Sequence, residues 1–282
     1  MSTTTGPAAS KVYTPTAETL AAVLSPAGRP TPPGPLAASI VFGWRAMLRI
    51  KHVPEQLFDV TAFPLIMTLM FTYLFGGALA DSPRDYLQFF LPGILVSSVV
   101  MITMYTGIGL NTDIEKGVFD RFRTLPVWRP AALVGMIFGD LLRYVIASLV
   151  ILAVGLALGF RPSGGVLGVV SSIALLVVFS FAFSWIWTYF GLVLRSEKSV
   201  MGVSMMVLMP LRFLSNVYVE PSTMPGWLQA FVNVNPITHL VDAIRGLMRG
   251  EIDGPAVTWT FVACILFVTV FGTLTMRRYN RK

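Results

Sequence analysis

Asn111-Thr-Asp-Ile-Glu-Lys-Gly-Val-Phe-Asp-Arg-Phe-Arg-Thr-Leu-Pro126 is a charged segment that lies between two long apolar runs. Its pattern Thr112-x-x-Glu115 is a capping box, which predicts that a new helix begins there. The helix should end before Pro126, because the residue that precedes a proline is pushed out of the helical region. Apolar and charged side chains recur at helical spacing on two separate faces. An amphipathic helix in this place is typical of a membrane protein that binds a soluble partner.

The composition of the whole chain agrees with a membrane protein. Of its 282 residues, 55% are hydrophobic and only 12% are charged, whereas about a quarter are charged in a soluble domain. The mean hydropathy is +0.71. Six apolar runs reach the length of about 20 residues that crosses a bilayer. These runs cover residues 58–80, 88–110, 131–159, 166–194, 199–219 and 255–276. We therefore expect an all-α integral membrane protein with six transmembrane helices.

The distribution of lysine and arginine predicts the orientation of these helices. An even number of spans puts both termini on one side of the membrane. If that side is the cytoplasm, the inner segments carry 15 basic residues and the outer segments carry four, Arg84, Arg161, Arg245 and Arg249. The positive-inside rule then places both termini in the cytoplasm. This topology accounts for the net charge of +7, so no nucleic-acid partner is needed to explain it.

Two segments precede the first apolar run. Residues 1–34 are rich in Ser, Thr, Ala, Gly and Pro, which predicts a disordered cytoplasmic tail. Residues 35–52 predict an amphipathic helix with Trp44 on its apolar stripe and Arg45 and Arg49 on its basic stripe. Such a helix would lie in the inner membrane interface. The alternative is a basic pre-membrane segment that only sets the topology.

Residues 220–254 form the longest outer segment and carry two helical patterns. The first pattern contains Trp227 and is interrupted by Asn235-Pro236. The second pattern follows, with Thr238 as a candidate cap. We expect two short re-entrant helices that are buried in protein, because lipid cannot satisfy the polar groups of a turn.

Several side chains are candidates for a substrate path or gate. Arg212 lies within the fifth apolar run, where an arginine is costly and therefore indicates a function. Alternatively, it snorkels to the outer interface or pairs with a carboxylate. The methionines of the same run suit a permissive binding surface but are also common packing residues. The complete set of candidates is Met205, Met209, Arg212, Asn235, Pro236 and His239.

Two local pairs of charged residues have ambiguous roles. Asp140 and Arg143 are three residues apart and so are neighbours on a helix, which favours a structural ion pair over a proton relay. His239-x-x-Asp242 provides only two metal ligands, so an ion pair between Asp242 and Arg245 is the better interpretation.

The sequence contains no machinery for chemistry of its own. It has no Gly-x-x-x-x-Gly-Lys-Ser/Thr phosphate loop, no recognisable catalytic constellation, and a single cysteine, Cys264, so neither a disulfide within the chain nor a cysteine metal site is expected. Intramembrane carboxylates are nearly absent, which disfavours an ion-coupled carrier or channel, and a membrane enzyme or scaffold would lack catalytic side chains. An external source of energy is therefore the main hypothesis.

The chain resembles the membrane subunits of type-2 ABC exporters, and in particular the daunorubicin/doxorubicin-resistance permease family of actinobacteria. The matching passages are Phe71-Thr-Tyr-Leu-Phe-Gly-Gly77, Asp85-Tyr-Leu-Gln-Phe-Phe-Leu-Pro-Gly93, Asp113-Ile-Glu-Lys-Gly-Val-Phe-Asp-Arg-Phe-Arg-Thr-Leu-Pro126, Met224-Pro-Gly-Trp227 and Asn235-Pro-Ile-Thr-His-Leu-Val-Asp-Ala-Ile-Arg-Gly246. Together they cover most of the chain after residue 35. They are much less specific for the cargo than for the superfamily.

The resemblance implies a bacterial plasma-membrane complex of two permease copies, identical or homologous, and two copies of a separate ABC ATPase. Residues 112–125 would be the coupling helix that sits in a groove of the ATPase, and residues 35–52 would be the connecting helix. The ATPase-coupling residues would be Glu115, Lys116, Phe119, Arg121, Phe122 and Arg123. ATP and Mg²⁺ would bind to the partner subunit, and this chain would hold no cofactor or metal. The cargo would be lipophilic: a drug, a polyketide or an envelope lipid or glycolipid.

Overall fold

The computed structural model describes residues 64–79, 82–118 and 131–281, together with positions 16, 34, 37, 40, 41, 44 and 62. The chain divides into two units, residues 1–33 and 34–282. In the first unit only Thr16 is described, so the predicted tail lies outside the described residues apart from Thr16 and Gly34. The second unit contains all the helices discussed below.

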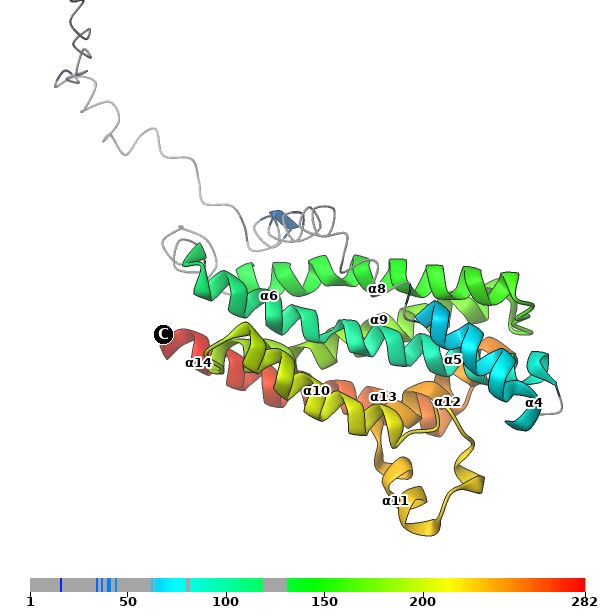
Figure 1. Ribbon diagram of the computed structural model, residues 1–282. Helices are drawn as coiled ribbons and strands as arrows, with labels where there is room; N and C mark the ends of the chain where they lie inside the picture. The colour runs from blue at the N-terminus through cyan, green and yellow to red at the C-terminus, as the bar shows by residue number, and fades with distance from the viewer. Residues whose placement is uncertain are drawn as a thin grey trace, which may run out of the picture. The chain divides into compact units, whose positions relative to one another are not determined.

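The described part of the second unit is built from helices and contains no strand (Figure 1). Their order is η2 (Phe71–Phe75), α4 (Gly76–Leu79), α5 (Pro83–Ile102), α6 (Met104–Glu115), α8 (Ala131–Ala157), α9 (Gly165–Val193), α10 (Glu197–Phe213), η3 (Pro221–Thr223), α11 (Gly226–Val234), α12 (Pro236–Arg249), α13 (Gly254–Phe267), η4 (Val268–Gly272) and α14 (Thr273–Arg281).

Four helical segments are long and apolar enough to cross a bilayer, among the residues that the structure describes. They are Pro83–Glu115, Leu133–Ala157, Gly165–Val193 and Gly254–Tyr279. These correspond to the second, third, fourth and sixth predicted runs. The prediction of six spans is therefore not confirmed. The described residues do form an all-helical bundle, and four of its helical segments are long enough to cross a bilayer.

The other two apolar runs form shorter helices. The first is described from residue 64 onward, where Pro64–Phe75 is apolar but spans only part of the predicted run. The fifth forms α10, which has 17 residues and ends at Phe213, before residue 219 where the run was expected to end. Its first turn contains Glu197 and Lys198, which lower the hydropathy of the helix.

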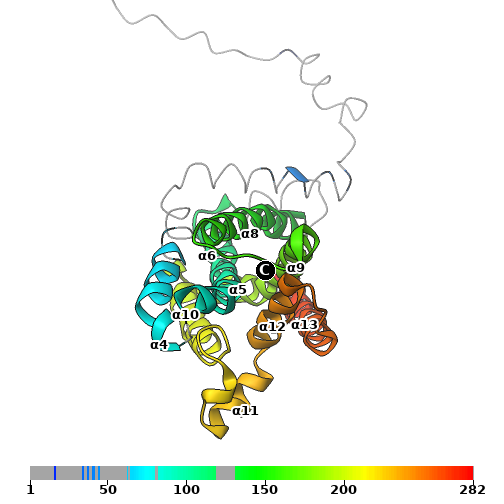
Figure 2. The ribbon, with the colours of Figure 1, turned by 90° about the vertical axis from the view of Figure 1, so that its right-hand side faces the viewer.

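Helix α9 contacts α5, α6, α8, α10, α12, α13, η4 and α14, and Figure 2 shows it between α8 and α13. Its sequence between Gly165 and Val193 has no charged residue and is apolar on all sides. A helix that is hydrophobic all round is expected to be surrounded by protein or lipid. The large aromatic side chains Phe179, Phe183 and Trp187 on α9 are fully buried.

The most extensive contact between described helices joins α6 to α9. A methyl group at Gly107 on α6 would overlap the carbonyl oxygen of Trp187, and one at Gly191 would lie 2.5 Å from the carbonyl oxygen of Gly107. Just above this contact, the Trp187 indole N–H donates to the hydroxyl oxygen of Thr103 (2.8 Å). Small residues at helix crossings let backbones approach closely in membranes, where packing drives association.

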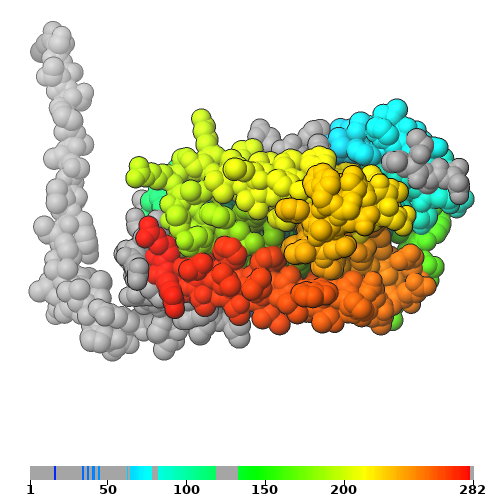
Figure 3. Space-filling model, turned by 90° about the horizontal axis from the view of Figure 1, so that it is seen from below, coloured from blue at the N-terminus to red at the C-terminus, as the bar shows by residue number. Residues whose placement is uncertain are grey.

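The surface of the bundle carries many exposed apolar side chains. On α13, Ile265 and Leu266 are 63% and 56% exposed, and on α10, Met206 and Phe213 are 79% and 61% exposed. Figure 3 shows α10 and the α13–α14 segment along the same face of the molecule. A soluble protein rarely exposes so large an apolar area, and the hydrocarbon of a bilayer is the environment that suits it.

We predict that Gly107→Ala destabilises the protein by about 1–3 kcal/mol, because the added methyl group would force α6 and α9 apart. The unfolding temperature of the purified protein in detergent measures the effect. Gly202→Ala on α10 is the matched control, since no atom lies within 4 Å of a Cβ at that position. An equal unfolding temperature for the two variants would contradict the importance of this contact.

Candidate coupling site and polar interior

The segment that opens the sequence analysis begins as the end of a long helix. Helix α6 continues through Thr112 to Glu115, and the chain then turns at Lys116 and Gly117. The Thr112 hydroxyl donates to the carbonyl oxygen of Ile108 (2.9 Å), as a threonine within a helix does. The prediction of a capping box at Thr112 is therefore wrong, because Thr112 has helical backbone and the preceding span extends five residues beyond residue 110.

Gly117 creates the break that Thr112 was expected to create. Its φ of +67° lies in the left-handed region, which glycine adopts without strain. Val118 is helical again. Glu115 and Lys116 are exposed at the turn, where they are available to a partner.

The remaining predicted coupling residues, Phe119, Arg121, Phe122 and Arg123, lie outside the described residues. The same holds for Arg45 and Arg49 of the predicted connecting helix. Trp44 is described: it is helical and 63% exposed. Their roles stay predictions.

The residues just before the turn attach it to the rest of the bundle. The Asn111 amide donates to the carbonyl oxygens of Gly191 (3.0 Å) and Leu194 (2.8 Å). These carbonyls belong to the C-terminal end of α9, where no further helical N–H is available to them. The Thr112 hydroxyl also lies 3.1 Å from the carboxylate of Glu197 at the start of α10. The exposed turn is therefore fixed to both α9 and α10.

The role of Asn111 was missed in the sequence, although a signal was present. The signal is the asparagine side chain directly after the apolar run that ends at residue 110. If this side chain is buried, its amide needs hydrogen-bond partners from another segment. Asn111 is 2% exposed.

A buried polar cluster joins α6, α8 and α9 in the interior. Asp140 and Arg143 form the predicted ion pair (3.2 Å), and both residues are buried. Asp140 also accepts a hydrogen bond from the Thr106 hydroxyl (2.6 Å). The Tyr144 hydroxyl lies 2.7 Å from the hydroxyl oxygen of Ser184 and 3.4 Å from that of Thr106. The Asp140 carboxylate thus has both an ion-pair partner and a hydrogen-bond donor, as a charge in an apolar interior requires.

Asn235 holds two helix ends together. Its side-chain oxygen accepts a hydrogen bond from the backbone N–H of Ile237 (2.9 Å), which caps α12. Its amide donates to the carbonyl oxygens of Leu211 and Leu214, both at 2.6 Å, at the end of α10. The cap of α12 is therefore Asn235 and not Thr238, because Pro236 occupies the first helical position, which suits proline.

The other candidates for a substrate path lie in different surroundings. Arg212 is 5% exposed and its guanidinium carbon is 5.6 Å from the centre of the Tyr218 ring. His239 stacks on Trp259 with ring centres 5.8 Å apart. Met205 is partly buried against the core, whereas Met209 is 36% exposed. The structure thus brings Arg212 and Asn235 to the same end of α10. His239 follows Asn235 by one turn of α12, with its backbone N–H 3.4 Å from the carbonyl oxygen of Asn235.

Arg245 on α12 connects three segments. Its guanidinium donates to the carbonyl oxygens of Phe89 (3.1 Å) and Asn216 (2.9 Å) and lies 3.7 Å from the carboxylate of Asp242. Burial lowers the pKa of Arg245 to about 10, although the Asp242 carboxylate opposes this shift. The guanidinium is therefore charged at neutral pH.

The ion pair between Asp242 and Arg245 confirms the interpretation favoured over a metal site. Asp242 accepts a further hydrogen bond from the Asn216 amide (2.5 Å). Within the described ranges, no group of three His, Cys, Asp or Glu side chains is arranged to hold a metal ion.

Comparisons with known proteins agree with this architecture. A family model described as ABC-2 type transporter matches residues 38–248. The chain is 50% identical to a daunorubicin resistance ABC transporter permease protein, DrrB1, of Streptomyces coeruleorubidus, and the match covers 99% of both chains. It is 27% identical to a probable doxorubicin resistance ABC transporter permease protein, DrrC, of Mycobacterium tuberculosis, over 72% of this chain and 75% of that one.

A more distant relative is the putative transport permease ycf38 of Cyanophora paradoxa, 27% identical over 81% of this chain and 78% of that one. The family model covers the exposed turn at Glu115, the polar cluster and the α10–α12 junction together. The long apolar helices and these matches identify an integral membrane protein, and the chain belongs to the ABC-2 type transporter family.

Proposed function

We propose that this chain is the membrane-spanning permease subunit of an ATP-driven exporter that moves a lipophilic cargo out of the cytoplasm or inner leaflet. A separate ABC ATPase subunit hydrolyses ATP, and two permease copies assemble with two ATPase copies. The observation that carries the proposal is the 50% identity, over 99% of both chains, to a permease named for daunorubicin resistance. A drug such as daunorubicin is thus one candidate cargo, and a polyketide or an envelope lipid or glycolipid is another.

Complementary support comes from what the chain lacks and what it exposes. Its sequence has no phosphate loop, so in an ATP-driven exporter the ATP would be bound by another subunit. The turn at Glu115 and Lys116 is exposed, while Asn111 and Thr112, just before it, are bonded to the ends of α9 and α10. A partner that pushes on the turn would therefore move two core helices at once.

The proposed mechanism is a two-state change of the bundle. Closure of the ATPase subunits upon ATP binding displaces the coupling segment, and α6, α9 and α10 tilt together as a rigid group. Because Asn235 joins the end of α10 to the start of α12, the tilt reaches the far end of the bundle. Cargo release follows if the cargo binds less tightly to the tilted state.

The partner is tested by gentle affinity purification of the full chain from native membranes, with mass spectrometry of the proteins that accompany it. We expect an ATPase with a phosphate loop in a one-to-one ratio with the permease. If no ATPase accompanies an intact permease, and transport persists without one, the protein is an ion-coupled carrier or channel instead.

We predict that Glu115→Ala reduces export by about fivefold or more while ATP hydrolysis and complex assembly stay intact, because an exposed contact to the ATPase is lost. Arg121→Ala should act in the same way. Export and ATP hydrolysis are measured together in reconstituted vesicles. The control is Glu251→Ala, which removes an exposed carboxylate that follows α12. Normal export by both Glu115→Ala and Arg121→Ala would refute the coupling assignment.

We predict that Arg212→Ala changes the relative export of charged and neutral cargoes by about tenfold, since a contact to a charged group is lost, without reducing the yield of the complex. Asn235→Ala is the structural comparison, because it removes hydrogen bonds from two helix ends and should lower the yield. Export is measured across a panel of lipophilic compounds. A lower yield for Arg212→Ala, with an unchanged cargo profile, would show that Arg212 is structural.

A further inference from the structure

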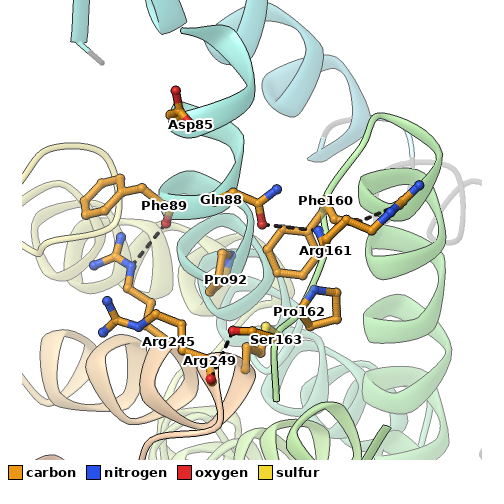
Figure 4. Close-up of a pocket in the computed structure, with 11 residues that line it drawn as sticks. Asp85, Gln88, Phe89, Pro92, Phe160, Arg161, Pro162, Ser163, Arg245 and Arg249 are labelled. Carbon is orange, nitrogen blue, oxygen red and sulfur yellow. Dashed lines mark hydrogen bonds between the residues drawn. The ribbon is translucent and has the colours of Figure 1, made fainter. Parts of the chain in front are cut away.

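Three segments enclose a hollow of about 430 Å³ at the end of the bundle that carries α12 (Figure 4). One wall is the first part of α5, with Asp85 and Gln88. The second is the connection between α8 and α9, residues 158–164, and the third is the end of α12. Three arginines are among the lining residues, which are Asp85, Gln88, Phe89, Pro92, Phe160, Arg161, Pro162, Ser163, Arg245, Met248 and Arg249.

Hydrogen bonds between the three segments fix the shape of the hollow. The Gln88 amide donates to the carbonyl oxygen of Gly159 (3.2 Å), and the Gln88 side-chain oxygen accepts from the backbone N–H of Arg161 (3.2 Å). The Ser163 hydroxyl donates to the carbonyl oxygen of Arg249 (3.0 Å). These bonds connect the α8–α9 segment to both other walls, so the hollow is built by the fold.

All four basic residues of the predicted outer segments gather around this hollow. Arg161, Arg245 and Arg249 line it. The fourth, Arg84, precedes the lining residue Asp85, and its Nε atom lies 3.8 Å from the place that a Cβ on Gly159 would take. Asp85 is the sole acidic residue among the lining side chains. Positive charge is therefore concentrated where the sequence has few basic residues.

Two of the arginines have structural roles that explain their presence. Arg245 is bonded to Phe89, Asn216 and Asp242. Arg161 donates to the carbonyl oxygen of Leu156 (2.9 Å) in the last turn of α8 and to that of Phe160 (2.8 Å) in the connection that follows. Arg249 has no such role: it is exposed, and its guanidinium makes no hydrogen bond or ion pair within the described part of the chain. Like charges that are held together favour the binding of an anion.

We propose that this hollow binds the phosphate group of an anionic ligand, with Arg249 as its principal contact and Arg161 and Arg245 supplying supporting charge. The flat guanidinium of arginine matches the geometry of a phosphate. The ligand is an acidic phospholipid headgroup or a free phosphate. The lipid is favoured by exposed apolar side chains beside two of the walls: Val166 and Leu167 are both 82% exposed, and Ile252 is 78% exposed. This site is independent of the cargo and of the ATPase proposed above.

The site is tested by native mass spectrometry of the full-length protein, with its ATPase if one co-purifies, during titration with phosphatidylglycerol. We expect Arg249→Gln to weaken phosphatidylglycerol binding by about fivefold, which is the contribution of one arginine at an anionic membrane surface. Arg249→Glu should weaken it further. Phosphatidylcholine, which has no net charge, should bind equally to all variants.

Arg195→Gln is the matched control, because Arg195 is exposed in the short connection between α9 and α10. It lies about 43 Å from the hollow, the length of the 29-residue α9. Inorganic phosphate is titrated in parallel: binding of phosphate that depends on Arg249, without binding of the lipid, would identify a soluble anion as the ligand. If Arg249→Gln and Arg195→Gln bind phosphatidylglycerol and phosphate equally well, the hollow is not an anion site.

Discussion

The contact between α6 and α9 is the interaction on which the rest of this structure depends. Gly107 and Gly191 let the two backbones touch, and the Trp187 indole then reaches Thr103 across the contact. Because α9 also touches seven other helical elements of the described bundle, the position of α6 affects most of them. The same contact brings Asn111 within hydrogen-bonding distance of the end of α9. An exposed turn that a partner can reach is thus joined to the helix that contacts the most other helical elements in the described part of the chain.

A second constraint explains the polar residues, because a membrane offers no water to helix ends or to buried charges. The protein meets this constraint with side chains from other segments. Asn111 bonds the end of α9, and Asn235 bonds the end of α10 and the start of α12. Thr106 and Ser184 complete the surroundings of Asp140 and Tyr144. Bonds of this kind join two helices. The same hydrogen bonds therefore provide partners for buried polar groups and hold the helices in place relative to one another.

The sequence was sufficient to predict what depends on neighbours along the chain. Long apolar runs identified the four longest helical segments, and the spacing of three residues identified the ion pairs of Asp140 with Arg143 and of Asp242 with Arg245. The capping box at Thr112 misled because burial of Leu110 and Asn111 against α9 extends the helix past it. Partners such as Thr106 and Ser184 are 34 to 40 residues away from theirs, and no local pattern reports contacts at that separation. The proximity of Arg84, Arg161, Arg245 and Arg249 around the hollow could not be predicted for the same reason, because they come from distant segments.

The ion pair of Asp140 with Arg143 has a consequence for how this chain enters the membrane during synthesis. Both partners lie on α8, one turn apart, so the pair forms as soon as that helix does, before α6 or α9 has docked. The translocation machinery therefore receives a segment whose two charges already neutralise each other, and the cost of passing it into lipid is reduced. Asp242 and Arg245 repeat this arrangement on α12. If the two partners lay on separate helices, the first charge to enter the bilayer would be unpaired until the second helix was inserted. The energetic cost of insertion would then depend much more on the order in which the helices enter.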